Sequence, residues 1–392
     1  MKVALILAGN PYAPNGAAGY MRRMYETREC VKRYGVEAVY LCHGGINFTD
    51  SERYVMSLGA RAKKTIKRAL RETRWGSRLE SKLVANRRGL HALAMYDELG
   101  IVPDVVVFND TITHDLFLKR HSGYSGMKVQ ILHNNGEFGK MIALSSPKVD
   151  PAWIKELEER IVNDSDVLVF VGAKNKQRFD VAHPECAGKS VHIHLGIEDI
   201  AKGNTFHAKA SDFFTFVCVG TVGTRKNQRV LMDVAEDPSI AQRARFIVVG
   251  DGPDYESCKK EADARGLSSL VQYVGASSNV AEYYRTADGF ISVSLDEGLP
   301  TVAIEAMSFG LPLVLTDVGG CAEVINGNGV LIETCEASAI VKSIKQFFEL
   351  FDAGEISGIA SRELFEQHYT TENMWEEYVE TFNEFMRVQK GR

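Results

Sequence analysis

The sequence has no long hydrophobic run and no cysteine pattern of the kind that binds metal. No apolar stretch of this 392-residue chain approaches the roughly 20 residues that cross a bilayer. Residues 1–8 are too short and too weakly charged for a secretion signal, so we expect a buried strand there. The seven cysteines are scattered without a CxxC motif, which argues against both disulfides and zinc. We therefore expect a cytoplasmic protein.

Metal-ligand spacing is missing elsewhere too. The sequence has no Asp-x-Asp pair at a suitable strand end, and its closest group of histidines, His183, His192 and His194, lies near a predicted linker. There is also no short internal repeat and no low-complexity segment. We expect neither a metal nor any other cofactor.

Charge is unevenly distributed along the chain, although the net charge is only −5. Residues 1–200 contain 29 Lys and Arg against 23 Asp and Glu, whereas residues 201–392 contain 17 against 28. Residues 61–88 alone contain 11 basic and two acidic residues, with apolar residues at helical spacing. This segment predicts one or two amphipathic helices that either contact an anionic membrane or expose a solvated basic face. Nucleic acid is a poor partner, because the chain is acidic overall and the segment lacks a stacking series of aromatic residues.

Short β-rich apolar runs alternate with helical stretches along the whole chain, which is typical of βαβ units and parallel sheets. Because 392 residues exceed one ordinary hydrophobic core, we expect two Rossmann-like domains that face a central cleft. We place an N-terminal domain at 1–196, a second domain at 197–370, and a C-terminal helix at 371–392 that packs back on the first domain. The predicted strands are 2–8, 36–42, 104–109, 127–132, 166–171, 190–195, 213–219, 245–249, 271–274, 289–294, 311–316 and 329–332.

Residues 294–310, SLDEGLPTVAIEAMSFG, predict a ligand-binding turn followed by a short helix. Gly298 allows the backbone to approach a ligand, Pro300 suits a helix start, and Gly310 suits a helix end. The N–H groups of Thr301 and Val302 are expected to be unpaired and to point at a phosphate.

Glu297 and Glu305 stand eight positions apart in this segment. A carboxylate beside a diphosphate is electrostatically unfavourable, so both are better interpreted as acceptors for sugar hydroxyls. The alternative is a solvated acidic pair on an ordinary connection between strand and helix.

Four segments in order resemble the donor-binding domain of glycosyltransferase family 4, whose members are retaining enzymes of GT-B fold. They are FVCVGTVGTRKNQ, RFIVVGDGP, VQYVGASSNVAEYYRTAD and SLDEGLPTVAIEAMSFGLPLVLTDVGG, and the resemblance covers roughly residues 213–333. In the first half it rests only on Pro14-Asn15-Gly16, on the strand ending in His133, and on HLGIE at 194–198.

The resemblance implies separate roles for the charged residues. Glu297 would bind the donor sugar, Glu305 would bind the ribose, and Lys226 with Arg225 would neutralise the departing diphosphate. Thr221 departs from the pattern, because many members have an arginine at this position. Backbone groups near the sugar and phosphates would come from Gly220, Gly298, Leu299, Pro300, Thr301 and Val302.

The remaining roles implied by the resemblance concern the base, the first loop and a histidine. Tyr273, Val274 and Gly275 would hold the base through backbone groups. Gly16 would let the first loop approach the diphosphate, and His133 would contact the sugar unless it is only a structural hydrogen-bonding group.

These residues together predict a retaining, metal-independent transferase that moves a sugar from a nucleoside diphosphate donor, UDP-linked first and GDP-linked next, to a glycan or lipid-linked acceptor. The family's usual mechanism is front-face displacement. The alternatives are an epimerase or hydrolase of the same fold, and a non-catalytic subunit that binds a nucleotide sugar. The expected location is the cytoplasm, with peripheral contact at the inner face of the membrane through 61–88.

Overall fold

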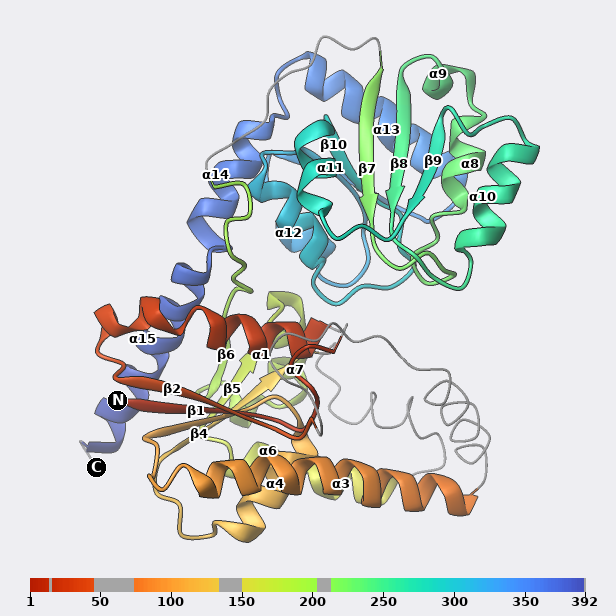
Figure 1. Cartoon of the computed structure of the whole chain (residues 1–392). Coiled ribbons are helices and arrows are strands. Elements are labelled where there is room, and N and C mark those ends of the chain that lie inside the picture. Colours follow the sequence, from red (N-terminus) through yellow and green to blue (C-terminus); the bar gives the residue numbers. More distant parts are fainter. Residues whose placement is uncertain (14–15, 46–73, 134–149, 203–212, 391–392) are drawn as a thin grey trace. The chain divides into compact units, whose positions relative to one another are not determined.

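The computed structural model describes residues 1–13, 16–45, 74–133, 150–202 and 213–390. The chain forms two compact units, shown in Figure 1. Unit 1 contains Met1–Gly196 and Thr371–Arg392, and unit 2 contains Ile197–Thr370.

Unit 1 is built on a six-stranded parallel sheet in the order β2-β1-β3-β4-β5-β6. Its inner strands are buried on both faces, as parallel strands covered by helices must be. The strands are β1 (Lys2–Leu7), β2 (Ala38–His43), β3 (Val105–Phe108), β4 (Met127–Leu132), β5 (Val167–Phe170) and β6 (Ser190–His192). The helices are α1 (Gly16–Glu26), η1 (Arg28–Tyr34), α3 (Arg74–Glu98), α4 (Thr111–Arg120), α6 (Pro151–Asp164), α7 (Ala173–Ala182), η2 (Pro184–Cys186) and α15 (Thr371–Lys390).

Unit 2 has a second six-stranded parallel sheet, in the order β12-β11-β10-β7-β8-β9. The strands are β7 (Phe214–Val219), β8 (Ala244–Val249), β9 (Val271–Gly275), β10 (Gly289–Ser292), β11 (Leu313–Thr316) and β12 (Gly329–Ile332). The helices are α8 (Val230–Ala235), α9 (Pro238–Ala241), α10 (Tyr255–Ala264), α11 (Val280–Thr286), α12 (Thr301–Ser308), η3 (Cys321–Val324), α13 (Ala337–Asp352) and α14 (Gly358–His368). The sheet places β7 beside β10, although β8 and β9 separate them in the sequence.

Aromatic and aliphatic side chains fill the interior of unit 2 between its sheet and α13. Phe347 of α13 contacts Phe214 and Phe216 of β7 edge to face, with ring centroids 5.4 Å apart in both pairs. Figure 1 shows α13 passing behind the strands of this sheet. Such a core holds the loops at the strand ends in fixed positions, which a binding site requires.

The C-terminal helix α15 belongs to unit 1. Its aromatic face is buried, with Trp375 and Tyr378 fully enclosed. The Tyr378 hydroxyl lies 2.9 Å from that of Tyr20 on α1, and Trp375 Nε1 donates to Thr27 Oγ1 at 3.2 Å.

The structure describes only part of the basic segment. Residues 61–73 lie outside the described residues, and 74–88 form the start of α3, on which Arg87 and Arg88 are exposed. Contact with a membrane therefore stays a prediction. No described helix combines the length and the apolar character that crossing a bilayer requires.

The fold class predicted from the sequence, two Rossmann-like domains with parallel sheets, is confirmed. All twelve predicted strands overlap the observed ones, with differences of a few residues at the ends. In such sheets, ligands bind beyond the carboxyl ends of the strands, so these ends are where the site is built.

Candidate functional site

The loops after β7 and β8, at the carboxyl edge of the unit 2 sheet, are in close backbone contact. Gly250, after β8, has φ +150°, and a Cβ there would lie 1.9 Å from the Gly220 carbonyl oxygen. A Cβ on Gly252 would lie 2.1 Å from the Val222 oxygen. Only glycine permits this contact, so the loop after β7 is fixed by the loop after β8.

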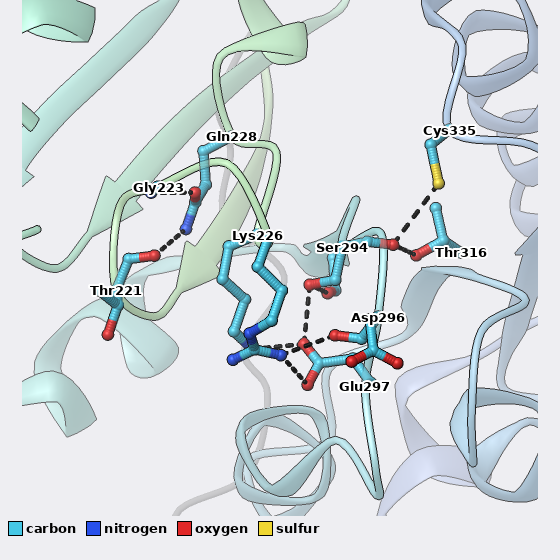
Figure 2. A network of polar contacts seen from close by, with 11 residues as sticks. Thr221, Gly223, Lys226, Gln228, Ser294, Asp296, Glu297, Thr316 and Cys335 are labelled. Atoms are coloured by element: carbon cyan, nitrogen blue, oxygen red, sulfur yellow. Dashed lines mark hydrogen bonds and ion pairs between the residues drawn. The ribbon is translucent and has the colours of Figure 1, made fainter. Parts of the chain in front are cut away.

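The side chain of Gln228 bridges two residues of the loop after β7. The sequence did not indicate this role. Its buried side chain accepts from the Gly223 N–H at 3.3 Å and donates to the Thr221 carbonyl at 3.1 Å (Figure 2). Its own carbonyl accepts from the Tyr273 hydroxyl at 3.0 Å. Thr221 itself is exposed, at the position where the family pattern has an arginine.

Lys226, Arg225 and Glu297 come together at the ends of β7 and β10, as Figure 2 shows for Lys226 and Glu297. Lys226 Nζ donates to Glu297 Oε1 in an ion pair whose side chains are only 15% and 8% exposed. Arg225 Nη1 donates to the Asp296 carbonyl at 2.6 Å and lies 3.5 Å from Glu297 Oε2. The sheet thus places two cations around one carboxylate.

Ser294 anchors the loop that carries Glu297, and it too was missed from the sequence. Its hydroxyl is buried and donates to Glu297 Oε1 at 2.7 Å. Its carbonyl accepts from Thr316 Oγ1 at 2.7 Å and from Cys335 Sγ at 3.5 Å (Figure 2). The carboxylate of Glu297 is therefore held from the β10 and β11 ends of the sheet.

The start of α12 differs from the prediction at one position. The Thr301 N–H was expected to be unpaired, but it donates to the Leu299 carbonyl at 2.9 Å. Pro300 has φ −77° and ψ 81°, which is an inverse γ-turn that brings these two groups together. The N–H groups of residues 303 and 304 donate to the Pro300 carbonyl, so within the described chain only the Val302 N–H of this turn has no such partner. The anion site expected here is therefore reduced to one amide.

A glycine pair after β11 packs against the Glu297 loop. Gly319 has φ +56°, and a Cβ there would lie 1.8 Å from the Glu297 carbonyl oxygen. The Gly320 N–H donates to the Gly298 carbonyl at 2.7 Å. Gly319 and Gly320 therefore fix the backbone of the loop that carries Glu297 and Gly298.

Glu305 lies about one turn beyond the first residue of α12, and its carboxylate has a partner that the sequence did not indicate. The Tyr284 hydroxyl of α11 donates to Glu305 Oε2 at 3.1 Å and lies 3.2 Å from the Val302 carbonyl. Burial, and to a lesser degree the Glu305 carboxylate, raises the pKa of Tyr284 above its ordinary value. Tyr284 therefore stays a hydrogen-bond donor that orients Glu305.

The end of β9 exposes one residue of the predicted base site. The pairing of β8 with β9 passes from Val248 and Tyr273 directly to Val249 and Gly275, so Val274 bulges out of the ladder and is 38% exposed. The Gly275 carbonyl is occupied by the Gly250 N–H at 2.9 Å. Of the three residues predicted for the base, Val274 is the most exposed.

His133 and Gly16 belong to unit 1. His133 Nε2 lies 2.5 Å from Asn109 Oδ1, and its ring contacts Tyr20 edge to face at 5.3 Å. Burial, together with the nearby Arg23 cation, lowers the pKa of His133 to about 4, so the imidazole is neutral at pH 7. Gly16 begins α1.

The structure thus brings Arg225, Lys226 and Glu297 into one cluster, and the loop of Glu297 leads into the helix that carries Glu305. The cluster can neutralise an anion through its two cations and accept hydrogen bonds from hydroxyl groups through its carboxylate. Within the ranges that the structure describes, no three His, Cys, Asp or Glu side chains gather in a way that could hold a metal ion.

Comparison with known proteins adds a family match for the same region. Residues 199–353 match the family model described as glycosyl transferases group 1. The O-antigen biosynthesis glycosyltransferase WbnH of Escherichia coli is 39% identical over 89 residues, which cover 23% of this chain and 25% of WbnH. The chain thus aligns with only about a quarter of this curated relative.

Solved structures resemble the whole chain. The lipopolysaccharide outer core galactosyltransferase WaaB superposes with a TM-score of 0.65 and 15% identity, covering 99% of this chain and all of WaaB. Anabaena HepE in complex with UDP-glucose superposes with a TM-score of 0.63 and 18% identity, covering 98% of this chain and all of HepE. At these identities the likeness concerns the fold. The chain therefore has the GT-B fold of two Rossmann-like units, and its residues 199–353 are similar to group 1 glycosyltransferases.

Proposed function

We propose that this protein is a glycosyltransferase that moves a sugar from a nucleoside diphosphate sugar to a glycan or lipid-linked acceptor in the synthesis of a surface polysaccharide or glycoconjugate. The observation that carries the proposal is the cluster of Arg225, Lys226 and Glu297 at the carboxyl edge of the unit 2 sheet. This cluster lies within the residues that match the group 1 family model.

Each charged group has a role in the proposal. Lys226 and Arg225 bind the diphosphate and neutralise the charge that develops as it departs. Glu297 accepts hydrogen bonds from sugar hydroxyls through Oε2, which has only a long contact of 3.5 Å with Arg225, whereas Oε1 receives both Ser294 and Lys226. Glu305 accepts from the ribose hydroxyls, with Tyr284 fixing its carboxylate.

The reaction that we propose is a metal-independent front-face displacement with retention at the anomeric carbon. The bond between that carbon and the diphosphate oxygen breaks, and a bond to the acceptor hydroxyl oxygen forms on the same face. The acceptor proton passes to the departing phosphate oxygen. In this scheme the protein supplies positioning and positive charge and needs no carboxylate nucleophile.

A UDP-linked sugar is our first choice of donor, and a GDP-linked sugar the second. HepE was solved with UDP-glucose, which supports the first choice at the level of fold. The WbnH and WaaB names, from O-antigen and lipopolysaccharide core synthesis, support a surface-glycan acceptor. We further propose that Val274 contacts the base, that Gly16 and His133 contact donor or acceptor, and that the enzyme works at the inner face of the membrane.

One observation favours a second candidate, a non-catalytic subunit that binds a nucleotide sugar. Thr221 is exposed where the family pattern has an arginine, so the site has one cation fewer beside the phosphates. Arg225 lies in the same loop and can compensate for it. Donor binding without turnover, against every acceptor extract tried, would favour this candidate.

The proposal is tested by incubating the purified chain with UDP-, GDP- and ADP-sugars, with and without membrane glycolipid extract, and identifying the products. Transfer that depends on the acceptor supports it. Free sugar formed equally without acceptor indicates a hydrolase, and an isomerised nucleotide sugar indicates an epimerase. Near-normal kcat/KM in either Glu305→Ala or Lys226→Ala would remove the assignment of this site.

A further inference from the structure

Glu297 has an unusual position for a residue that binds only sugar. Its carboxylate is the anionic partner of Lys226 and lies 3.5 Å from Arg225, the same two cations that the proposed function assigns to the diphosphate. Both Glu297 and Lys226 are largely buried, so their interaction is weakly screened by solvent. A diphosphate that binds Lys226 must therefore share it with a carboxylate.

The surrounding contacts keep this carboxylate from leaving the site. Ser294 holds Oε1 at 2.7 Å, and the Ser294 carbonyl is itself fixed by Thr316 at 2.7 Å. The Gly319 backbone lies directly against the Glu297 carbonyl, so the loop has no room to shift on that side. When Lys226 turns toward a phosphate, Glu297 stays close to it as a negative charge.

We propose that Glu297 makes the site select a glycosylated nucleoside diphosphate over the bare one. A sugar on the diphosphate offers hydroxyl donors to the Glu297 carboxylate. Their hydrogen bonds compensate for the ion pair with Lys226 that is weakened when Lys226 binds the phosphate. A bare nucleoside diphosphate offers no such donors and meets uncompensated repulsion. Once the sugar has been transferred, Glu297 forms its ion pair with Lys226 again, which favours release of the bare nucleoside diphosphate.

This inference rests on the proposed function, and it differs from a simple role in sugar binding in what it predicts. If Glu297 only bound the sugar, its replacement would leave the affinity for a bare diphosphate unchanged. If it competes for Lys226, its replacement must increase that affinity. The two accounts therefore predict different results with the same ligand.

The test is calorimetric titration of the full chain with UDP, GDP and ADP and with the glucose ester of each. Glu297→Gln keeps the shape of the side chain and its ability to accept from Ser294, but removes the charge. We expect it to bind the bare diphosphate about tenfold more tightly than the wild type does, and the glucose ester no more tightly. Asp296→Asn is the matched control, because it removes the same charge from the neighbouring exposed residue. It should change both dissociation constants less than about twofold.

The outcomes separate the inference from the function on which it rests. Equal or weaker binding of the bare diphosphate by Glu297→Gln, with the wild type binding it measurably, overturns the inference and leaves the proposed function standing. Absence of binding of all six ligands to both proteins overturns both. If Glu297→Gln does not fold, as judged by circular dichroism, Glu297→Asp retracts the carboxylate from Lys226 and must also tighten binding of the bare diphosphate.

Discussion

The two units have the same kind of six-stranded parallel sheet, yet the polar residues at their carboxyl edges differ in kind. In unit 2 the edge carries charge, with Lys226 and Glu297 in a largely buried ion pair. In the described part of the unit 1 edge, neutral His133 lies against Asn109, and the Arg23 cation is close enough to lower the pKa of the histidine. Asp110, which follows β3 in unit 1, has a structural role, because it caps α4 and accepts from the Ala8 N–H at 3.1 Å.

Under the proposed function, this difference lets one architecture serve two kinds of ligand. A diphosphate requires fixed positive charge, whereas sugar hydroxyls are satisfied by neutral donors and acceptors. The fold determines where each site lies, and the residues after the strands determine what it binds. Under the proposed function, the charged edge of unit 2 binds the donor phosphates and sugar, and His133 at the unit 1 edge contacts donor or acceptor.

The largest effect on activity is expected from removing the positive charge of Lys226 in unit 2. Lys226→Ala should lower kcat/KM by about 10²–10³-fold, because the developing charge on the diphosphate loses its principal cation. Steady-state kinetics measure this, with the nucleotide sugar that the product assay shows to be the donor. Lys342→Ala is the control, since Lys342 is an exposed lysine of the same unit in a 4.0 Å ion pair with Glu333. An equal loss in both variants would mean that charge alone, and not this position, matters.

A second prediction concerns the loop that carries Glu297. Gly319→Ala should lower the free energy of unfolding of unit 2 by about 3 kcal/mol, because the added Cβ meets the Glu297 carbonyl at a positive φ. Gly327 also has a positive φ, +70°, but a Cβ there meets nothing within 4 Å, so Gly327→Ala should cost only about 1 kcal/mol. Urea denaturation compares the two. Equal losses would show that the contact with the Glu297 loop is not important.

Replacing Glu305 should weaken donor binding to an intermediate degree. Glu305→Ala removes a charged acceptor for ribose and should weaken donor binding by about tenfold to a hundredfold. Tyr284→Phe should give part of this loss, because it removes the hydroxyl that donates to Glu305 at 3.1 Å. Titration with donor measures both variants. Unchanged affinity in Glu305→Ala would exclude its role at the ribose.

The last prediction concerns His133 at the edge of unit 1, and the expected effect depends on pH. The pKa of His133 is lowered to about 4 in the fold, below its ordinary value of about 6.5, so the unfolded chain takes up the proton first. Its contribution to stability is therefore complete above pH 6.5 and is lost as the pH falls toward 4. His133→Asn should lose less stability than the wild type over this range in thermal melts. His183→Asn, at a half-buried histidine of unit 1, is the control and should follow the wild type.

Part of the charged site could be predicted because its residues lie in short continuous segments. The run 294–310 indicated Glu297, Glu305 and the helix end at Gly310, which has φ +71°. The pairing of Lys226 with Glu297 could not be predicted, because it spans 71 residues and depends on β7 lying beside β10. The spacing of residues within a motif does not predict a strand order of this kind.

The residues that were missed are buried polar groups, which resemble ordinary core or turn positions in a sequence. Gln228, Tyr284 and Ser294 each orient a neighbour through a side-chain hydrogen bond, to Thr221, Glu305 and Glu297 respectively. The expectation for the Thr301 N–H was wrong for a local reason, since the γ-turn at Pro300 satisfies that group. In unit 1 the resemblance offered only isolated residues, so the roles of Gly16 and His133 stay predictions.

One measurement tests the central claim, that the charged edge of unit 2 binds a nucleoside diphosphate sugar for transfer. UDP-, GDP- and ADP-sugars are incubated with the wild type and with Lys226→Ala, and slow release of free sugar in the absence of acceptor is followed. We expect the wild type to release sugar from one donor class, with UDP first, and Lys226→Ala to be slower by at least about a hundredfold. Equal rates in the two proteins, or no release from any donor by the wild type, would contradict the claim.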